Sequence, residues 1–126
     1  MTREIIYSPQ APEPIGPYSQ AVQAGNLLFI SGQIALDKPS GQLVTSDIVS
    51  ETKLVMYNLE QILKAAGLDF SNVVKSTIFL KDMNAFPKVN EVYGSYFKTA
   101  PPARETVEVS RLPKDVNVEI SCIAVK

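Results

Sequence analysis

The chain has 126 residues, 45% of them hydrophobic, which suits one domain over residues 1–126 with a buried core and no need of disulfides or structural metal. Its 12 basic and 13 acidic residues are spread along the chain and give a net charge of −1. We therefore expect neither nucleic acid nor an anionic membrane surface as the main partner. No signal peptide or membrane-spanning stretch is recognisable, and the one cysteine, Cys122, lies among apolar residues, so we expect a cytoplasmic protein with a buried thiol.

The residue types that are absent limit the chemistry further. There is no histidine and no cysteine pair, which excludes histidine triads and zinc hydrolysis. No glycine-rich phosphate loop is present, so a tightly held nucleotide cofactor has no support. Any catalysis must depend on carboxylates, hydroxyls, arginine or lysine, and we expect no cofactor and no metal.

The N-terminal half predicts strands followed by a helix. A short strand at residues 4–7 precedes a proline-rich irregular loop, and residues 18–24 and 27–32 read as two strands joined by the turn at Gly25-Asn26. Apolar residues then recur at helical spacing from 47 to 66, and Gly67 is placed as the C-terminal stop. The positions of this apolar stripe are Ile48, Val55, Leu59, Ile62, Leu63 and Ala66.

The C-terminal half predicts a strand, a second helix and two final strands, giving the order ββ(β)αβαββ. In the strand at residues 72–81 we expect one side to carry Val74, Ser76, Ile78 and Leu80. The second helix is expected to start at an Asn84 cap and to end at Pro101 and Pro102. Its apolar stripe is Phe86, Val89, Tyr93 and Phe97. The last strands are expected at residues 103–110 and 116–125.

Alternation along these strands predicts two unlike sheet faces. We expect the helices to cover a face with Val107, Val109, Val118, Ile120, Cys122 and Ala124. The opposite face is predicted to be mixed in character, with Arg104, Thr106, Glu108, Glu119, Ser121, Ile123, Val125, Phe29 and Phe79. A face of this kind favours contact with further copies of the chain, so we predict a homo-oligomer with sites near subunit boundaries.

Arg104 is the first candidate for the functional site. It follows the stiff run Ala100-Pro101-Pro102-Ala103, which restricts the loop that leads into the next strand. A guanidinium held in this way can grip a planar carboxylate with two hydrogen bonds, although a surface ion pair is the commoner role of an arginine.

Glu119 is the second candidate, since it interrupts the apolar run Val118-Glu119-Ile120. A partly desolvated carboxyl there can hold a water and transfer protons; the alternative is an outward glutamate paired with a lysine or with Arg104. Thr106 is a candidate for hydrogen bonding a substrate, although threonine is also ordinary in strands.

Five further residues are candidates for the wall of the pocket. Tyr18, Ser31 and Gly32 come from the predicted hairpin, where glycine lets the backbone approach a ligand closely. Phe86 and Asn90 come from the second helix, although a phenylalanine at helical spacing usually lies in the core.

Four runs of sequence together resemble the RidA/YjgF family of reactive-intermediate deaminases. They are Ile15-Gly16-Pro17-Tyr18-Ser19-Gln20-Ala21, Ile30-Ser31-Gly32-Gln33, Pro102-Ala103-Arg104, and Val118-Glu119-Ile120 through Ala124. The resemblance implies an α+β, chorismate-mutase-like fold, with a mixed sheet and two helices on one face. It also implies a homotrimer with the sheets facing the centre and clefts between subunits.

The resemblance further implies the hydrolysis of 2-imino acids, and of the enamines that tautomerise to them, released by pyridoxal-phosphate-dependent dehydratases. Arg104 matches the family's carboxylate-binding arginine, Glu119 the glutamate that holds the attacking water, and Tyr18, Ser31 and Gly32 the cleft lining. Thr106 stands where relatives often carry cysteine or another small residue.

Glu105 departs from the family, in which a small or apolar residue usually follows the arginine. Strand alternation should turn Glu105 away from Arg104, while a competing ion pair between the two is the alternative.

These observations favour a 2-iminobutanoate/2-iminopropanoate deaminase. The alternative is a module that binds small 2-oxo acids and acts on a partner enzyme without turnover. RNA cleavage comes last, because histidine and a basic patch are both absent. The deaminase hypothesis requires that the side chains of Arg104 and Glu119 open into one cavity. A structure with these two side chains on opposite sides of the sheet would contradict it.

Overall fold

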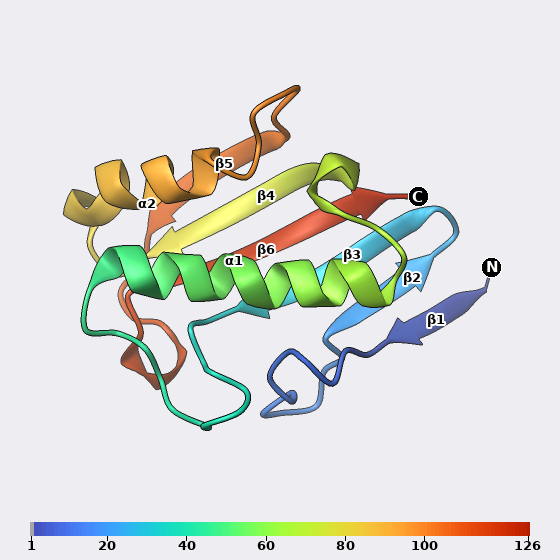
Figure 1. Cartoon of the computed structure of the whole chain (residues 1–126), viewed down its shortest axis with the longest axis horizontal. Helices are drawn as coiled ribbons and strands as arrows, with labels where there is room; N and C mark the ends of the chain where they lie inside the picture. Colours follow the sequence, from blue (N-terminus) through green and yellow to red (C-terminus); the bar gives the residue numbers. More distant parts are fainter. Residues whose placement is uncertain (1) are drawn as a thin grey trace.

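The computed structural model describes residues 2–126, which form one six-stranded mixed sheet with helices on one face (Figure 1). The strand order is β1-β2-β3-β6-β4-β5. Its strands are β1 (Arg3–Ile6), β2 (Ala21–Ala24), β3 (Leu27–Gln33), β4 (Val73–Leu80), β5 (Ala103–Glu108) and β6 (Val118–Val125). All neighbours are antiparallel except β4 and β5, whose parallel pairing follows from the crossover through a helix. The predicted α+β class with two helices on one face is confirmed.

Helix α1 (Ile48–Ala65) lies along the middle of the sheet and shows how local sequence sets its ends. The carboxylate of Asp47 accepts a hydrogen bond from the Ser50 amide at 2.8 Å, which satisfies one of the unpaired donors of the first turn. Gly67 takes a positive φ of 76° just after the helix, the conformation in which a glycine has no steric penalty. The predicted helix and its glycine stop are confirmed.

Helix α2 (Phe86–Gly94) differs from the prediction at both ends. A 3₁₀ turn, Met83–Ala85, precedes it, and Asp82 rather than Asn84 supplies the capping carboxylate, which accepts from the Asn84 amide at 2.9 Å. The helix ends at Gly94, before the prolines at 101 and 102, so those prolines do not stop it. Two further 3₁₀ turns are Phe70–Asn72 and Pro113–Asp115.

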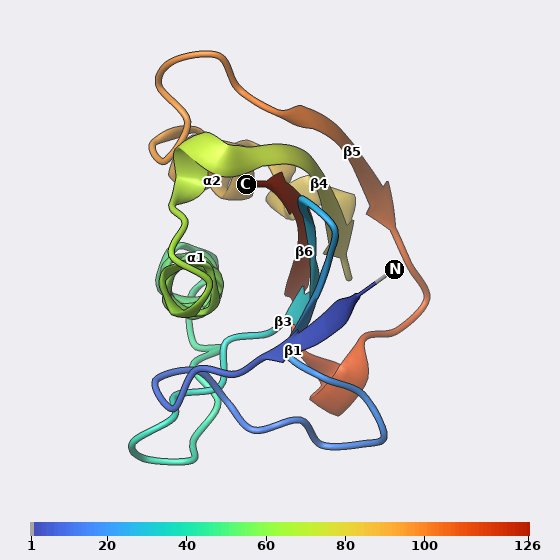
Figure 2. The same cartoon turned by 90° about the vertical axis from the view of Figure 1, so that its right-hand side faces the viewer.

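The core lies between the helices and the covered sheet face, which Figure 2 shows from the side. Its fully buried members include Leu28, Val55, Met56, Leu59, Ile62, Leu63, Ile78, Leu80, Val89, Val118 and Ile120. Removal of this apolar surface from water is the main driving force for the fold. No helix within residues 2–126 is long and apolar enough to cross a membrane.

The predicted face of β5 is wrong. In the parallel register, Arg104 lies beside Ser76 and Thr106 beside Ile78, and both of those β4 residues are fully buried on the helix side. Arg104 and Thr106 therefore face α2, whereas Val107, which is 40% exposed, points to the other face. Because β5 is the edge strand, its helix side is only partly covered and can hold the polar Arg104 against α2. Its other side is open and carries the apolar Val107.

A bulge in β4 causes a second difference. The register between β4 and β6 shifts between Val73 and Lys75, so the extra residue, Val74, turns outward and is 44% exposed. Val74 is therefore not on the side of Ser76, Ile78 and Leu80 as predicted.

A buried carboxylate connects α1 to the start of β6. Glu51 is fully buried, and its two oxygens accept hydrogen bonds from the Asn117 amide at 2.8 Å, the Asn117 side chain at 2.7 Å and the Val118 amide at 3.2 Å. A buried carboxylate is tolerated when several donors satisfy it in this way. Glu51 therefore fixes the point at which β6 begins.

Replacement of Glu51 by leucine tests this role. The substitution puts an apolar side chain of similar size in place of the carboxylate and leaves two backbone N–H groups and the Asn117 side-chain amide without an acceptor, so the free energy of unfolding should fall by at least about 2 kcal/mol. Urea unfolding measures the change, with Glu60→Leu on the same helix as the control. Equal losses in the two variants would contradict the assigned role.

Candidate functional site

The guanidinium of Arg104 lies against two aromatic rings of α2. Its central carbon is 5.1 Å from the ring centre of Tyr93 and 5.6 Å from that of Phe86, both within cation–π range. Its Nη1 donates a hydrogen bond to Asn90 Oδ1 at 2.7 Å. Three residues spaced along one helix therefore fix the orientation of this planar cation, and the two predicted wall residues, Phe86 and Asn90, do meet Arg104.

Around Arg104 there is room and unused hydrogen-bonding capacity. A hollow of about 350 Å³ is lined by Arg104, Tyr93, Pro101 and Pro102. No carboxylate among residues 2–126 forms an ion pair with this guanidinium. The buried hydroxyls of Tyr93 and Thr106 also have no hydrogen-bond partner among the described residues. This half of the site can accept an anionic group with further acceptor atoms.

Glu119 lies in a separate pocket on the other face of the sheet. This pocket has a volume of about 340 Å³, and its lining residues are Ile15, Tyr18, Ser31, Gly32, Ile34, Pro113 and Glu119. Burial raises the pKa of Glu119 above its ordinary value of 4.5. A shift in this direction makes the carboxyl a better candidate for proton transfer than an unperturbed glutamate.

Gly32 makes the room that Glu119 occupies. A β-carbon built on Gly32 would lie 2.0 Å from Glu119 Oε2 and 2.8 Å from its carboxyl carbon. Any side chain at position 32 would therefore displace the carboxyl group. The glycine of the Ile30-Ser31-Gly32-Gln33 run has a steric role in this pocket.

Ser31 and Tyr18 are fixed by the loop that precedes β2. Ser31 Oγ donates to the Ser19 carbonyl at 2.6 Å, and the Ser31 amide donates to the Gln20 carbonyl at 2.9 Å. The Tyr18 hydroxyl accepts from the Ile15 amide at 3.3 Å. The structure thus brings Tyr18, Ser31 and Gly32 together around Glu119.

The prediction that the side chains of Arg104 and Glu119 open into one cavity is wrong, because they lie on opposite faces of the sheet. Glu119 pairs with Phe79 across β4 and β6, whereas Arg104 pairs with Ser76, and odd and even positions of β4 point to opposite faces. The error follows from the misassigned face of β5. Each chain therefore carries two half-sites, one with Arg104, Thr106, Phe86 and Asn90, the other with Glu119, Tyr18, Ser31 and Gly32.

Glu105 points away from Arg104, as the alternation predicted. Its carboxylate lies 3.1 Å from Lys75 Nζ and accepts from the Thr77 hydroxyl at 3.3 Å. The hydrogen bond from Lys75 lowers the pKa of Glu105. The competing ion pair with Arg104 is not formed.

The sequence does not predict six residues that line the two pockets. Around Arg104 these are Tyr93, expected only in the apolar stripe of the helix, and Pro101 and Pro102; around Glu119 they are Ile15, Ile34 and Pro113. A signal for Tyr93 exists, since positions 86, 90 and 93 lie on one face of a helix. The other five lie outside the α-helices and strands, where periodicity gives no information.

The fold is that of an α+β protein with a mixed six-stranded sheet, and similar sequences and structures show which family it belongs to. A family model described as Endoribonuclease L-PSP matches residues 8–126. A RutC family protein of Pyrococcus horikoshii is 55% identical, covering 98% of both chains. A mouse protein named 2-iminobutanoate/2-iminopropanoate deaminase is 52% identical, covering 98% of this chain and 92% of its own.

A solved structure of a related protein has the same fold as this chain. The structure of a protein of unknown function of the Rid family, YyfA of Yersinia pestis, has a TM-score of 0.97 at 44% identity, covering 99% of this chain and 100% of its own. The chain belongs to the RidA/YjgF family, and the resemblance seen in the sequence is confirmed.

Replacement of Gly32 by alanine tests the steric role of that glycine. The added methyl group should push the flexible carboxyl of Glu119 toward the open pocket and solvent, so its pKa should fall back toward 4.5. A carbon-13 NMR titration of the carboxyl groups measures this, with Gly94→Ala as the control because a β-carbon there meets nothing within 4 Å. An unchanged Glu119 pKa in Gly32→Ala would contradict the account.

Proposed function

We propose that this protein is a 2-iminobutanoate/2-iminopropanoate deaminase, which hydrolyses the imines and enamines released by pyridoxal-phosphate-dependent dehydratases to 2-oxo acids and ammonia. The observation that carries the proposal is the combination of an oriented guanidinium with a carboxyl of raised pKa above Gly32. The name of the 52% identical mouse protein supports the same activity. The absence of histidine from the sequence and the net charge of −1 speak against RNA cleavage, despite the description of the family model.

Within one chain Arg104 and Glu119 do not share the cavity that this activity requires, so we infer that the working site is assembled between two copies of the chain in a homotrimer. The two half-sites of one chain lie on opposite faces of its sheet, so a single chain cannot apply both groups to a small molecule. The face that carries Glu119 also exposes large apolar side chains, among them Phe29 at 44% and Val107 at 40%. Packing of the β5 edge of one copy, which carries Arg104, against this face of a neighbour would remove apolar surface from water and bring the Arg104 half-site to the neighbour's Glu119 half-site.

Each half-site has one task in the reaction. Arg104 binds the substrate carboxylate with its paired donors, which places C2 in front of the Glu119 pocket of the neighbour. Glu119 takes a proton from water as the water oxygen attacks C2 of the protonated imine, which gives a carbinolamine. Glu119 then passes that proton to the amino nitrogen and accepts the hydroxyl proton as the C–N bond breaks and the C=O bond forms. Ammonia and a 2-oxo acid result. Imines hydrolyse readily in water, so positioning and one carboxyl suffice without a cofactor, and we place the protein in the cytoplasm, where dehydratases release such species.

The direct test generates 2-aminoacrylate in situ with a serine dehydratase and follows the loss of the imine signal. The protein should accelerate that loss, and Arg104→Lys should lower kcat/KM by about 10- to 100-fold because a point charge replaces a two-pronged donor. Arg3→Lys, on the exposed β1, is the control. Full activity of Arg104→Lys would contradict the proposal.

Glu119→Gln separates the deaminase from a module that only binds 2-oxo acids. The deaminase account expects this variant to bind 2-oxobutanoate with nearly wild-type affinity, measured by calorimetry, while ammonia release is lost. A wild-type protein that binds 2-oxobutanoate without accelerating imine loss would favour the binding module.

A further inference from the structure

We propose that Gln20 is a positioning residue of the Glu119 pocket, because its buried carboxamide fixes the loop that supplies Ile15 and Tyr18 to the pocket wall. The loop, residues 8–18, lies outside the sheet between β1 and β2. This inference rests on the proposed function for its activity measurement, but not for its structural one.

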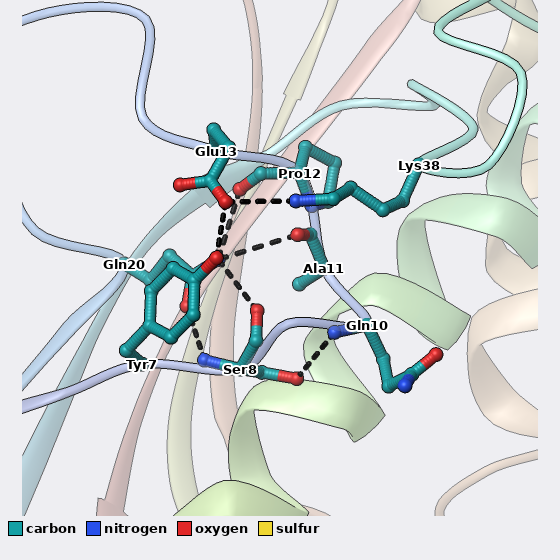
Figure 3. Close-up of polar contacts among 8 residues, drawn as sticks. All are labelled: Tyr7, Ser8, Gln10, Ala11, Pro12, Glu13, Gln20 and Lys38. Carbon is teal, nitrogen blue, oxygen red and sulfur yellow. Dashed lines mark hydrogen bonds and ion pairs between the residues drawn. The ribbon is translucent and has the colours of Figure 1, made fainter.

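The side chain of Gln20 makes contacts along the whole first half of this loop (Figure 3). It is only 2% exposed. Its Oε1 accepts from the Ser8 amide at 2.6 Å, and its Nε2 donates to three carbonyls, those of Ser8 at 3.1 Å, Pro12 at 2.9 Å and Ala11 at 3.4 Å. The side chain of Gln20 thus supplies the hydrogen bonds that a neighbouring strand would otherwise give to the backbone of residues 8–12.

The sequence of the loop explains why an anchor is needed. Four of its residues are prolines, which have no backbone N–H and cannot join a ladder of main-chain hydrogen bonds. Its carbonyls still require donors where they are buried. A carboxamide offers N–H donors and a carbonyl acceptor on two separate atoms without carrying a charge, so it can serve several backbone groups at once.

Gln20 is also connected to the other wall of the pocket. Its main-chain carbonyl accepts from the Ser31 amide at 2.9 Å, next to Gly32. A small hollow of about 30 Å³ lies behind Tyr18, and its lining includes Gln20, Ile15 and Gly32. Movement of the Gln20 carboxamide would therefore displace residues on both sides of the Glu119 pocket.

A second contact holds the outer side of the loop. Glu13 accepts from Lys38 Nζ at 2.9 Å and from the Tyr7 hydroxyl, and the hydrogen bond from Lys38 lowers the pKa of Glu13. Exposed pairs of this kind contribute little to stability. The buried carboxamide is accordingly the main anchor, and the ion pair is an auxiliary one.

The test replaces Gln20 by glutamate, which keeps the shape of the side chain but turns its donor group into an acceptor. At pH 8 the ionised carboxylate faces three carbonyls, so KM for the imine should rise about tenfold while kcat changes less than about twofold, as expected when a binding wall is loosened. Amide hydrogen exchange at Ser8 and residues 11–18 should accelerate, and that of α1 should not.

Acidification supplies a readout that a merely structural role would not move. A carboxyl buried among carbonyls has a raised pKa, so toward pH 5.5 it becomes protonated and donates one hydrogen bond again. The ratio of KM between Gln20→Glu and the wild type should then shrink. Gln23→Glu is the matched control, since Gln23 is also buried, on β2, but outside the pocket lining, and its KM should stay within about twofold of wild type.

Three results would decide against Gln20. These are a wild-type KM at pH 8, unchanged exchange in residues 11–18, or an equal rise of KM in Gln23→Glu. Should Gln20→Glu not fold, Gln20→Met decides, since it keeps the length of the side chain and removes its hydrogen bonds without adding a charge: a raised KM with faster exchange in residues 11–18 supports the inference, and no change in either overturns it. A wild-type protein without deaminase activity rejects the proposed function alone, and affinity for 2-oxobutanoate then replaces KM in every comparison.

Discussion

The contact of Arg104 with Tyr93, Phe86 and Asn90 determines how the rest of the molecule can act. It holds the guanidinium on the helix side of β5, at the edge of the sheet, with its plane and direction set by one helix. Because Glu119 points to the other face of the same sheet, this contact separates the two groups within each chain. Under the proposed function, both groups reach one substrate only where two copies of the chain meet.

The separation also has an electrostatic consequence. Within one chain Arg104 does not lie beside Glu119, where it would favour the carboxylate and lower its pKa; in the proposed assembly the bound substrate carboxylate lies between the neighbour's guanidinium and Glu119 and offsets that charge. Within the chain, desolvation is the cause of the shift, and it raises the pKa. The environment of the Glu119 carboxyl is therefore set by burial, by the absence of a side chain at Gly32 and by the pocket walls at Ile15 and Tyr18. Arg104, the proposed carboxylate-binding group, is oriented separately by α2.

The sequence predicted what periodicity and turn chemistry control, such as the α1 stripe with its stop at Gly67, the hairpin at Gly25 and the burial of alternate residues in β6. It failed where a position depends on neighbours in space. The face of β5 is set by its register with β4, and Val74 turns outward at a bulge, neither of which alternation reveals. The pocket residues could be named individually, but their division between two half-sites depends on the sheet.

The central claim is that Arg104 of one copy acts with Glu119 of another, and mixed oligomers test it most directly. Arg104→Lys and Glu119→Gln chains, each poorly active alone, are unfolded together in equal amounts and refolded. The account predicts recovery of about a quarter of wild-type turnover, since that share of intersubunit sites receives both unaltered residues. A mixture no more active than the average of its two separate components would contradict it.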